Sequence, residues 1–329
     1  MSEYVIGIDT GSTKSHLAIF DTEGNFVHFE RWGPLSHESV PGTFELFEEE
    51  FGRFVNGALS KAGISMKQTA YSVLGLTGCD TKLQYRILYD IAKRIGFERF
   101  TLSNDAYLGV PAGNPKGVGI CGINGTGCTI AGINQKGKML QIGGVGFISG
   151  DYGGGGYLGR KVVSAVYSEL FRKCPQTKMT PMLMQKLGIT DKHDFVDTMY
   201  DRIDNGGYYK FNCAEMLFKA ALENDRTAIR MLRDMGESYA GGISCMIDEL
   251  QFSRDEELPV VFAGSVFVKG GHPLLIDTIK EIVSKNHSEY RVKYILLKAP
   301  PVAGAVVWAF NKLGKYGFHD KINERLLEV

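Results

Sequence analysis

The 329-residue sequence predicts an α/β protein with two lobes, duplicated halves and a cleft between them. A pattern of strand, glycine turn and strand opens the chain and returns from Gly117 onward, which indicates a duplication. Short apolar runs alternate elsewhere with helical patterns, as in proteins whose sheets contain parallel strands. The length suits about two domains. We place them at residues 1–114 and 115–329, with the second richer in helix.

The first half begins with three strands joined by tight turns, at residues 4–9, 15–20 and 26–30. A Walker-type loop or a dinucleotide fingerprint is followed by a helix, whereas here a strand follows the first glycine turn, so both motifs are disfavoured. Apolar spacing and terminal glycines predict the other elements of this half, which are helices at 43–62 and 82–95 and strands at 70–76 and 100–103.

The second half repeats the meander and then becomes mainly helical. Its predicted strands lie at 118–123, 129–133, 139–142 and 259–262. Its predicted helices lie at 158–171, 195–203, 213–222, 228–250, 274–283 and 302–313. Parallel strands between helices, together with two antiparallel meanders, lead to the two-lobed architecture.

The overall composition excludes several classes of protein. The chain has 37 Lys and Arg residues and 37 Asp and Glu residues, so no net charge favours nucleic acid or anionic membranes. No apolar run approaches the roughly 20 residues of a membrane-spanning helix, and the start lacks the features of a signal peptide. We therefore expect a cytoplasmic protein. The six cysteines form no C-x-x-C pair, which disfavours disulfides and zinc or iron–sulfur sites.

Glycines, 41 in all, concentrate in short turns after apolar strands, where the backbone can approach a ligand closely. In the turn from Asp9 to Lys14, successive backbone N–H groups can hold phosphate oxygens, with hydroxyl groups as further donors. The carboxylate of Asp9 could hold Mg²⁺ through water. One such turn alone could be an ordinary hairpin. The matching turn at residues 124–128 and the segment 263–265 make a phosphate-binding cleft the better interpretation.

In this order, these segments resemble the N-acetylglucosamine kinase and BadF/BadG/BcrA/BcrD ATPase family of the actin/hexokinase/Hsp70 superfamily. The resemblance covers nearly the whole chain and rests on GIDTGSTK at 7–14, LTGCD at 76–80, NDA at 104–106, GTG at 125–127, GGVGFISGD at 143–151 and AGSV at 263–266. It implies an actin-like ATPase (ribonuclease H-like) fold with the nucleotide between the lobes. It also implies ATP and Mg²⁺ as cofactors, an amino sugar such as N-acetylglucosamine or N-acetylmuramic acid as acceptor, and a homodimer.

The resemblance also implies roles for individual residues. Asp105 matches the general base, which orients the attacking sugar hydroxyl and accepts its proton; a helix N-cap is the structural alternative. The residues expected at ATP are Asp9, Gly11, Ser12, Thr13, Lys14, Gly125, Thr126, Gly127, Asn212, Gly264 and Ser265. The residues expected at the sugar are Ser36, His37, Thr77, Gly78, Asp105, Gly144, Val145, Gly146 and Asp151. For Asp151 the alternative is a solvated loop residue.

Three departures from the family pattern fall on the acceptor side. Ser36 stands where relatives have a sugar-contacting asparagine, Val145 where a tryptophan is frequent, and Tyr152 where a glutamate is usual. The phosphate turns keep the pattern. We therefore expect an altered acceptor pocket that admits a larger amino sugar such as N-acetylmuramic acid. The glycine-rich stretch at 143–156 could close over the sugar and exclude water.

Two functions compete with a sugar kinase. One is an ATPase that energises a partner enzyme, of the 2-hydroxyacyl-CoA dehydratase or benzoyl-CoA reductase activator type; the absence of close cysteine pairs disfavours its iron–sulfur version. The other is a non-catalytic sugar sensor. The presence of both Asp9 and Asp105 favours an active enzyme. Glucosamine, glucose and other small polyols stay open as acceptors.

Overall fold

Two five-stranded sheets frame the protein in the computed structural model, which describes residues 3–38, 43–146, 148–204 and 213–329. The first sheet has the order β3-β2-β1-β4-β5, and the second has the order β10-β9-β6-β7-β8. The strands are β1 (Tyr4–Thr10), β2 (Ser15–Asp21), β3 (Phe26–Trp32), β4 (Thr69–Leu76), β5 (Phe100–Ser103), β6 (Gly119–Asn124), β7 (Cys128–Ile133), β8 (Met139–Gly143), β9 (Leu258–Ala263) and β10 (Val292–Leu296).

Both sheets have the same topology. In each, three strands form an antiparallel meander, and two further strands continue parallel to its first strand. β1 therefore corresponds to β6, and the turn after β1 corresponds to the turn after β6. This repetition confirms the predicted duplication of the two halves.

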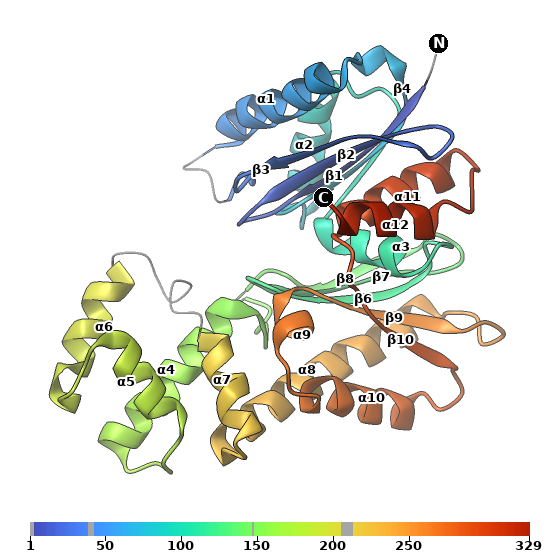
Figure 1. Ribbon diagram of the computed structural model, residues 1–329. Coiled ribbons are helices and arrows are strands. Elements are labelled where there is room, and N and C mark those ends of the chain that lie inside the picture. Colours follow the sequence, from blue (N-terminus) through green and yellow to red (C-terminus); the bar gives the residue numbers. More distant parts are fainter. Residues whose placement is uncertain (1–2, 39–42, 147, 205–212) are drawn as a thin grey trace.

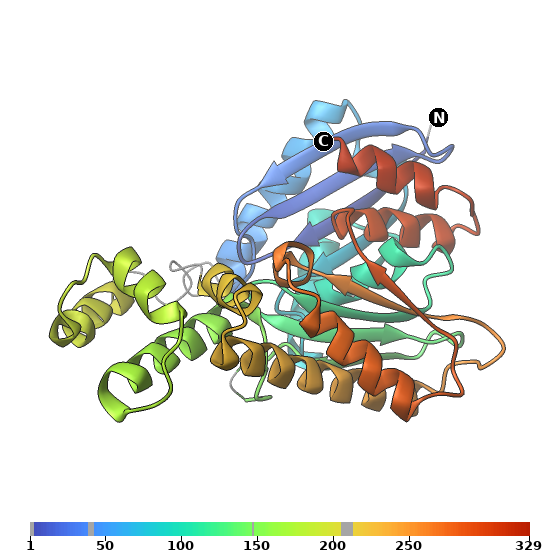
Figure 2. The same cartoon turned by 60° about the horizontal axis from the view of Figure 1, so that its bottom comes forward.

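The helices lie in layers around and between the sheets. They are α1 (Phe44–Ala62), α2 (Lys82–Ile95), α3 (Gly109–Gly113), α4 (Gly154–Arg172), α5 (Met179–Leu187), α6 (Phe195–Asp204), α7 (Cys213–Leu222), α8 (Arg226–Leu250), α9 (Ser265–Lys269), α10 (Leu274–Asn286), α11 (Val302–Lys312) and α12 (His319–Leu327), with 3₁₀ turns η1 (Met66–Gln68), η2 (Asp105–Leu108) and η3 (Lys192–Asp194). Figure 1 shows α1 and α2 on the outer face of the first sheet and α8 and α10 on that of the second. α4, α5 and α6 extend to one side in both views (Figure 2).

α11 joins the two halves through the core between the sheets. Every residue from Val302 to Phe310 is buried, because the helix packs against β1 and β4 on one side and α3 on the other. An apolar surface all round a helix is expected only where protein covers every face. Gly304 allows this approach, since a Cβ there would lie 1.9 Å from the carbonyl oxygen of Leu108. The C-terminal chain thus returns to the first sheet. The domain boundary near residue 114 remains a prediction.

The predicted strands and long helices are all present, with small shifts at their ends. Local signals act as expected at α1, where Thr43 caps the N-terminus and Gly63 ends the helix in the left-handed conformation. Pattern analysis missed the short elements α3, α5, α9, α12 and β10. It also began α4 too late, because consecutive glycines are poor helix formers. No helix in the described ranges has the length and apolar character needed to cross a membrane.

Candidate active site

A cavity of about 920 Å³ lies between the β1–β2 turn, the β6–β7 turn and the carboxyl ends of β4 and β5. Its wall includes the predicted residues Gly11, Ser12, Thr13, Thr77, Gly78, Asp105, Gly125, Thr126, Gly127, Gly144, Gly146 and Asp151. These residues are up to 140 positions apart in the sequence, yet the duplicated topology brings them together. Parallel strands expose their carboxyl ends at one edge, where ligands of α/β sheets bind.

The β1–β2 turn presents backbone and hydroxyl donors to the cavity. Ser12 and Thr13 are exposed at its tip. The base of the turn is fixed by the N–H of Leu35, which donates to the carbonyl of Gly11 at 3.0 Å. A Cβ at Gly11 would lie 2.7 Å from the carbonyl oxygen of Lys14, so the tight backbone path requires glycine at this position. Such a turn can hold phosphate oxygens without large reorganisation.

The β6–β7 turn is tied directly to the start of α4. The N–H of Gly154 donates to Oδ1 of Asn124 at 2.7 Å, and the N–H of Gly155 donates to the carbonyl of Gly125 at 2.8 Å. Gly154 has a φ of +82°, and a Cβ there would lie 2.5 Å from the carbonyl oxygen of Thr126. The glycines therefore let a helix N-terminus approach the turn, which adds a favourable potential for phosphate.

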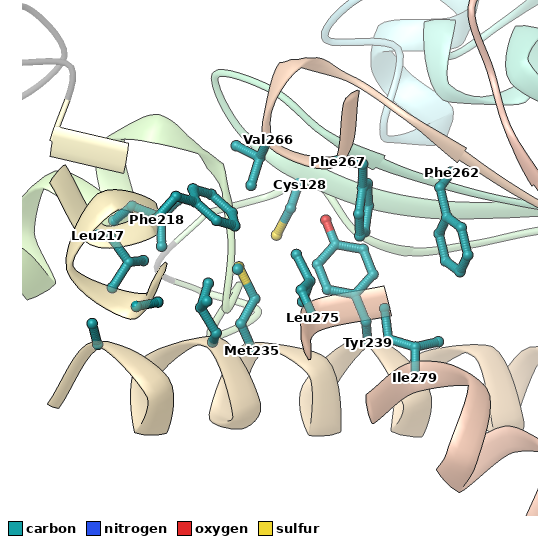
Figure 3. Close-up of a cluster of buried hydrophobic side chains, with 14 of the residues drawn as sticks. Cys128, Leu217, Phe218, Met235, Tyr239, Phe262, Val266, Phe267, Leu275 and Ile279 are labelled. Atoms are coloured by element: carbon teal, nitrogen blue, oxygen red, sulfur yellow. The ribbon is translucent and has the colours of Figure 1, made fainter. Parts of the chain in front are cut away.

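The second turn also rests on the hydrophobic core below it. Figure 3 shows Tyr239 rising from α8, with its hydroxyl group directed toward the region of Cys128. That hydroxyl donates to the carbonyl of Ile123 at 2.6 Å, at the end of β6. The ring of Phe267 packs edge-on against Tyr239, with 5.1 Å between centroids. A buried hydrogen bond and an aromatic contact therefore fix the position of the β6–β7 turn relative to α8.

Asp105 projects from the turn that follows β5. Asn104, and not Asp105, caps η2, because its side chain accepts the N–H of Ala106 at 2.8 Å. The N-cap interpretation of Asp105 is thus wrong, and its partly buried carboxylate faces the cavity. Burial is the main cause that raises the pKa of Asp105 to about 6; a hydrogen bond from Thr77 opposes it, and the charge of Asp80 assists it. This carboxylate is ionised at neutral pH but basic enough to accept a proton.

Asp80 is a second carboxylate in the cavity, and the sequence analysis did not assign it a role. Its Oδ1 accepts hydrogen bonds from Nδ2 of Asn104 at 3.0 Å and from Nε2 of Gln141 at 2.6 Å. Asn104 follows β5 and Gln141 lies in β8, so Asp80 connects the two sheets beside Asp105. Its place directly after a strand, in Thr77–Asp80, was the available signal.

Asp9 lies at the end of β1, just outside the cavity wall, with a side chain that is 16% exposed. Burial raises the pKa of Asp9 well above its usual value, Asp105 adds to this effect, and Lys14 opposes it. Without a nearby cation, this carboxylate is costly to ionise. It therefore fits a site in which a bound cation would stabilise its negative charge. Residues in the described ranges form no cluster of three or more His, Cys, Asp or Glu side chains suited to a metal. One carboxylate with water and phosphate ligands suits Mg²⁺.

Asp151 organises the glycine-rich segment before α4. The N–H groups of Gly144 and Gly146 donate to its Oδ2 at 3.0 and 2.8 Å, and the hydroxyl of Ser149 donates to Oδ1. Gly144 has a φ of +89°, which a residue with a side chain rarely adopts. Asp151 is therefore more than a solvated loop residue. It holds the loop in shape while its side chain borders the cavity.

The predicted acceptor residues near α1 lie behind the cavity wall. Ser36 is buried, and its hydroxyl accepts the N–H of Glu38 at 3.2 Å. His37 stacks on Phe44 with 4.3 Å between ring centroids, and a Cβ at Gly78 would meet its ring. Glu38, which the sequence analysis missed, lines the cavity instead.

The other predicted residues divide into two groups. Lys14, Val145, Gly264 and Ser265 are described but do not line the cavity. Gly264 packs behind the β6–β7 turn, where a Cβ would lie 2.4 Å from the carbonyl oxygen of Asn124. Asn212 lies outside the described residues. Further wall residues that the sequence analysis did not assign are Tyr157, Arg160 and Lys161 on α4.

Comparisons with known proteins find relatives over nearly the whole chain. The profile of the BadF/BadG/BcrA/BcrD ATPase family matches residues 6–309. An N-acetylmuramic acid/N-acetylglucosamine kinase of Clostridium acetobutylicum is 24% identical over 93% of this chain and 98% of that protein. An N-acetyl-D-glucosamine kinase of Dictyostelium discoideum is 24% identical over 94% of this chain and 98% of that protein.

Solved structures share the fold at lower sequence identity. A candidate N-acetylglucosamine kinase from Chromobacterium violaceum has a TM-score of 0.69 and 19% identity, covering 93% of this chain and 98% of that one. The hexokinase of Schistosoma mansoni has a TM-score of 0.59 and 14% identity, covering 94% and 85%. The predicted two-lobed, actin-like fold is therefore confirmed. With its profile match across nearly the whole length, the chain belongs to the BadF/BadG/BcrA/BcrD ATPase family.

Proposed function

We propose that this protein is an ATP-dependent kinase that transfers the γ-phosphate of ATP to a hydroxyl group of an N-acetylated amino sugar. The observation that carries the proposal is the shared cavity, in which Asp105 faces the same space as the two glycine turns. The curated relatives bear the names of N-acetylglucosamine and N-acetylmuramic acid kinases, which supports this class of acceptor.

The described residues can perform the steps that phosphoryl transfer requires. Backbone N–H groups and hydroxyls at Thr13 and Thr126 would hold the phosphates from both sides. Asp105 would orient the sugar hydroxyl and accept its proton as the P–O bond forms. Mg²⁺, held near Asp9 through water, would neutralise phosphate charge when it is bound.

Asp80 and Asp151 would both support the site of the acceptor. Asp80 fixes Asn104 and thereby the turn that carries Asp105. Asp151 fixes the loop that contains Gly144 and Gly146. Positioning of this kind accounts for most of the rate that a kinase provides, because the phosphoryl transition state needs alignment more than covalent chemistry. The proposal includes a homodimer in the cytoplasm, which the family resemblance supports.

An iron–sulfur version of the rival ATPase finds little support in the thiols. Cys121 and Cys128 are buried, and burial raises the pKa of both thiols to about 12. These two buried thiols are not an exposed cysteine pair of the kind that would bridge two subunits. A sugar-independent ATPase remains the result that would favour the partner-driven function.

The direct test measures ADP release by the purified protein with ATP and Mg²⁺. The panel contains N-acetylglucosamine, N-acetylmuramic acid, glucosamine, glucose and N-acetylmannosamine, and Asp105→Asn is the matched control. The proposal expects ADP release that depends on an N-acetylated sugar and falls by a factor of about 10² or more in the variant. A slow rate that is equal with and without every sugar would refute it.

A further inference from the structure

One face of α4 forms an outer wall of the cavity. The wall residues there are Gly153, Gly156, Tyr157, Arg160 and Lys161. Their spacing of three and four positions places them on the same side of the helix. The first two are glycines beside the β6–β7 turn, whereas the last two are cations farther along the axis. Along α4, the cavity wall is therefore formed by backbone near the β6–β7 turn and by positively charged side chains farther from it.

The two cations have no acidic partner within the part of the chain that the structure describes. Arg160 and Lys161 are both exposed, and neither takes part in an ion pair there. The carboxylates of the wall come from Glu38, Asp80, Asp105 and Asp151, and its cations from these two positions. Four carboxylates repel an anionic acceptor, so an acidic sugar needs compensating positive charge.

A chain of ring contacts connects the cations with the acceptor side. Nζ of Lys161 lies 5.5 Å from the ring centroid of Tyr157. That ring lies 5.3 Å from the ring of Tyr152, the neighbour of Asp151 in the sequence. Asp151 in turn holds the glycine loop that is expected at the sugar. The cations thus border the part of the cavity that contains Tyr152 and Asp151, where the acceptor is expected.

The phosphates of the nucleotide are expected at another place. Gly154 contacts the β6–β7 turn, and Arg160 follows it six residues later, about 9 Å along the helix axis. The turns already supply backbone donors for phosphate oxygens. A guanidinium and an ammonium group at this distance suit a separate carboxylate, which arginine can bind through two parallel hydrogen bonds.

We propose that Arg160 and Lys161 form a carboxylate-binding subsite that selects amino sugars bearing an acidic substituent. The inference rests on the proposed function and adds a specificity determinant to it. N-acetylmuramic acid, an N-acetylglucosamine that carries a carboxylate on an ether group, is the probe of this chemistry.

The test compares kcat/KM for N-acetylmuramic acid and N-acetylglucosamine in wild type and in Arg160→Gln/Lys161→Gln. The ratio of the two values should fall about tenfold or more in the double variant, because only the acid loses charge-assisted hydrogen bonds. Arg172→Gln is the control, since Arg172 lies at the far end of α4, also over an aromatic ring and outside the cavity wall. Its ratio should equal that of wild type. Calorimetric binding of N-acetylmuramic acid gives a second readout that does not need turnover.

The outcomes separate the two proposals. An unchanged ratio in the double variant, with binding of the acid also unchanged, would overturn the subsite. A higher KM for ATP with both sugars, at a constant ratio, would assign the cations to the nucleotide and equally overturn it. Turnover of N-acetylglucosamine alone by the wild type would refute the subsite and leave the kinase in place. Absence of turnover with every sugar would refute the kinase itself, and weaker binding of the acid by the double variant would then still support the subsite.

Discussion

The acidic limb of the pH profile offers a sharp test of the proposed base. Asp105 accepts a proton only when it is ionised, so activity should fall as the pH drops through its pKa. Burial and the neighbouring Asp80 raise that pKa to about 6. Ionisation of Asp105 should then be about 90% at pH 7 and about 10% at pH 5. An aspartate with an ordinary pKa would keep most of its activity down to about pH 5.

Asp80→Asn tests the electrostatic part of this reasoning. The side-chain oxygen of asparagine can still accept the hydrogen bonds from Asn104 and Gln141, so the turn should keep its shape. The substitution removes one negative charge near Asp105. The charged form of Asp105 then becomes less costly, and its pKa falls. We expect the acidic limb to move by about 0.5–1 pH unit toward lower pH.

The assay measures kcat/KM for the sugar from about pH 4.5 to pH 8.5, because this quantity reports the ionisation of Asp105 before the sugar binds. Asp90→Asn on the exposed face of α2 serves as a control with the same change of charge far from the cavity. ATP itself titrates in this range, but equally for every variant, so the difference between variants is the informative quantity. If activity fell at the same pH in wild type and in Asp80→Asn, the electrostatic coupling between Asp80 and Asp105 would be refuted. If the activity of the wild type fell only below about pH 5, the raised pKa of Asp105 would be refuted.

Three further predictions concern stability. Asp105→Asn should stabilise the free protein by about 1–2 kcal/mol near pH 8, because the raised pKa of Asp105 makes its ionisation oppose folding increasingly from about pH 4 and fully above about pH 6. The gain should vanish near pH 4, and Asp90→Asn should show none in thermal unfolding. Tyr239→Phe should lower the free energy of unfolding by about 1–2 kcal/mol, because the carbonyl of Ile123 loses its buried hydrogen-bond donor. Urea denaturation measures this loss as a lower midpoint, and an unchanged midpoint would contradict the role of Tyr239. Gly304→Ala should destabilise by more than about 3 kcal/mol, because its Cβ would meet the backbone of Leu108, whereas Gly57→Ala in the open surface of α1 should be neutral or stabilising.

Local chemistry made much of this protein predictable. Strand patterns, tight turns and helix-ending glycines predicted both meanders and the long helices, because these features depend on neighbouring residues. Asp105 could be named because the NDA segment at 104–106, just after β5, resembles the part of the family pattern that carries the general base. Repetition of the meander predicted that two such turns would face each other, and residues of both turns line one cavity.

Tertiary structure decided the features that depend on distant partners. Asp80 bridges two sheets through Gln141, and no local pattern reports a partner 61 positions away. The glycines at the start of α4 read as helix breakers, yet contacts with Asn124 and Gly125 hold them in the helix. Arg160 and Lys161 would be ordinary surface cations on an isolated helix. They become wall residues only because the β6–β7 turn anchors α4 with that face toward the cavity. The sequence by itself thus determined the strands of both meanders, the long helices and the two glycine turns, whereas packing across the cleft decided which side chains line the cavity.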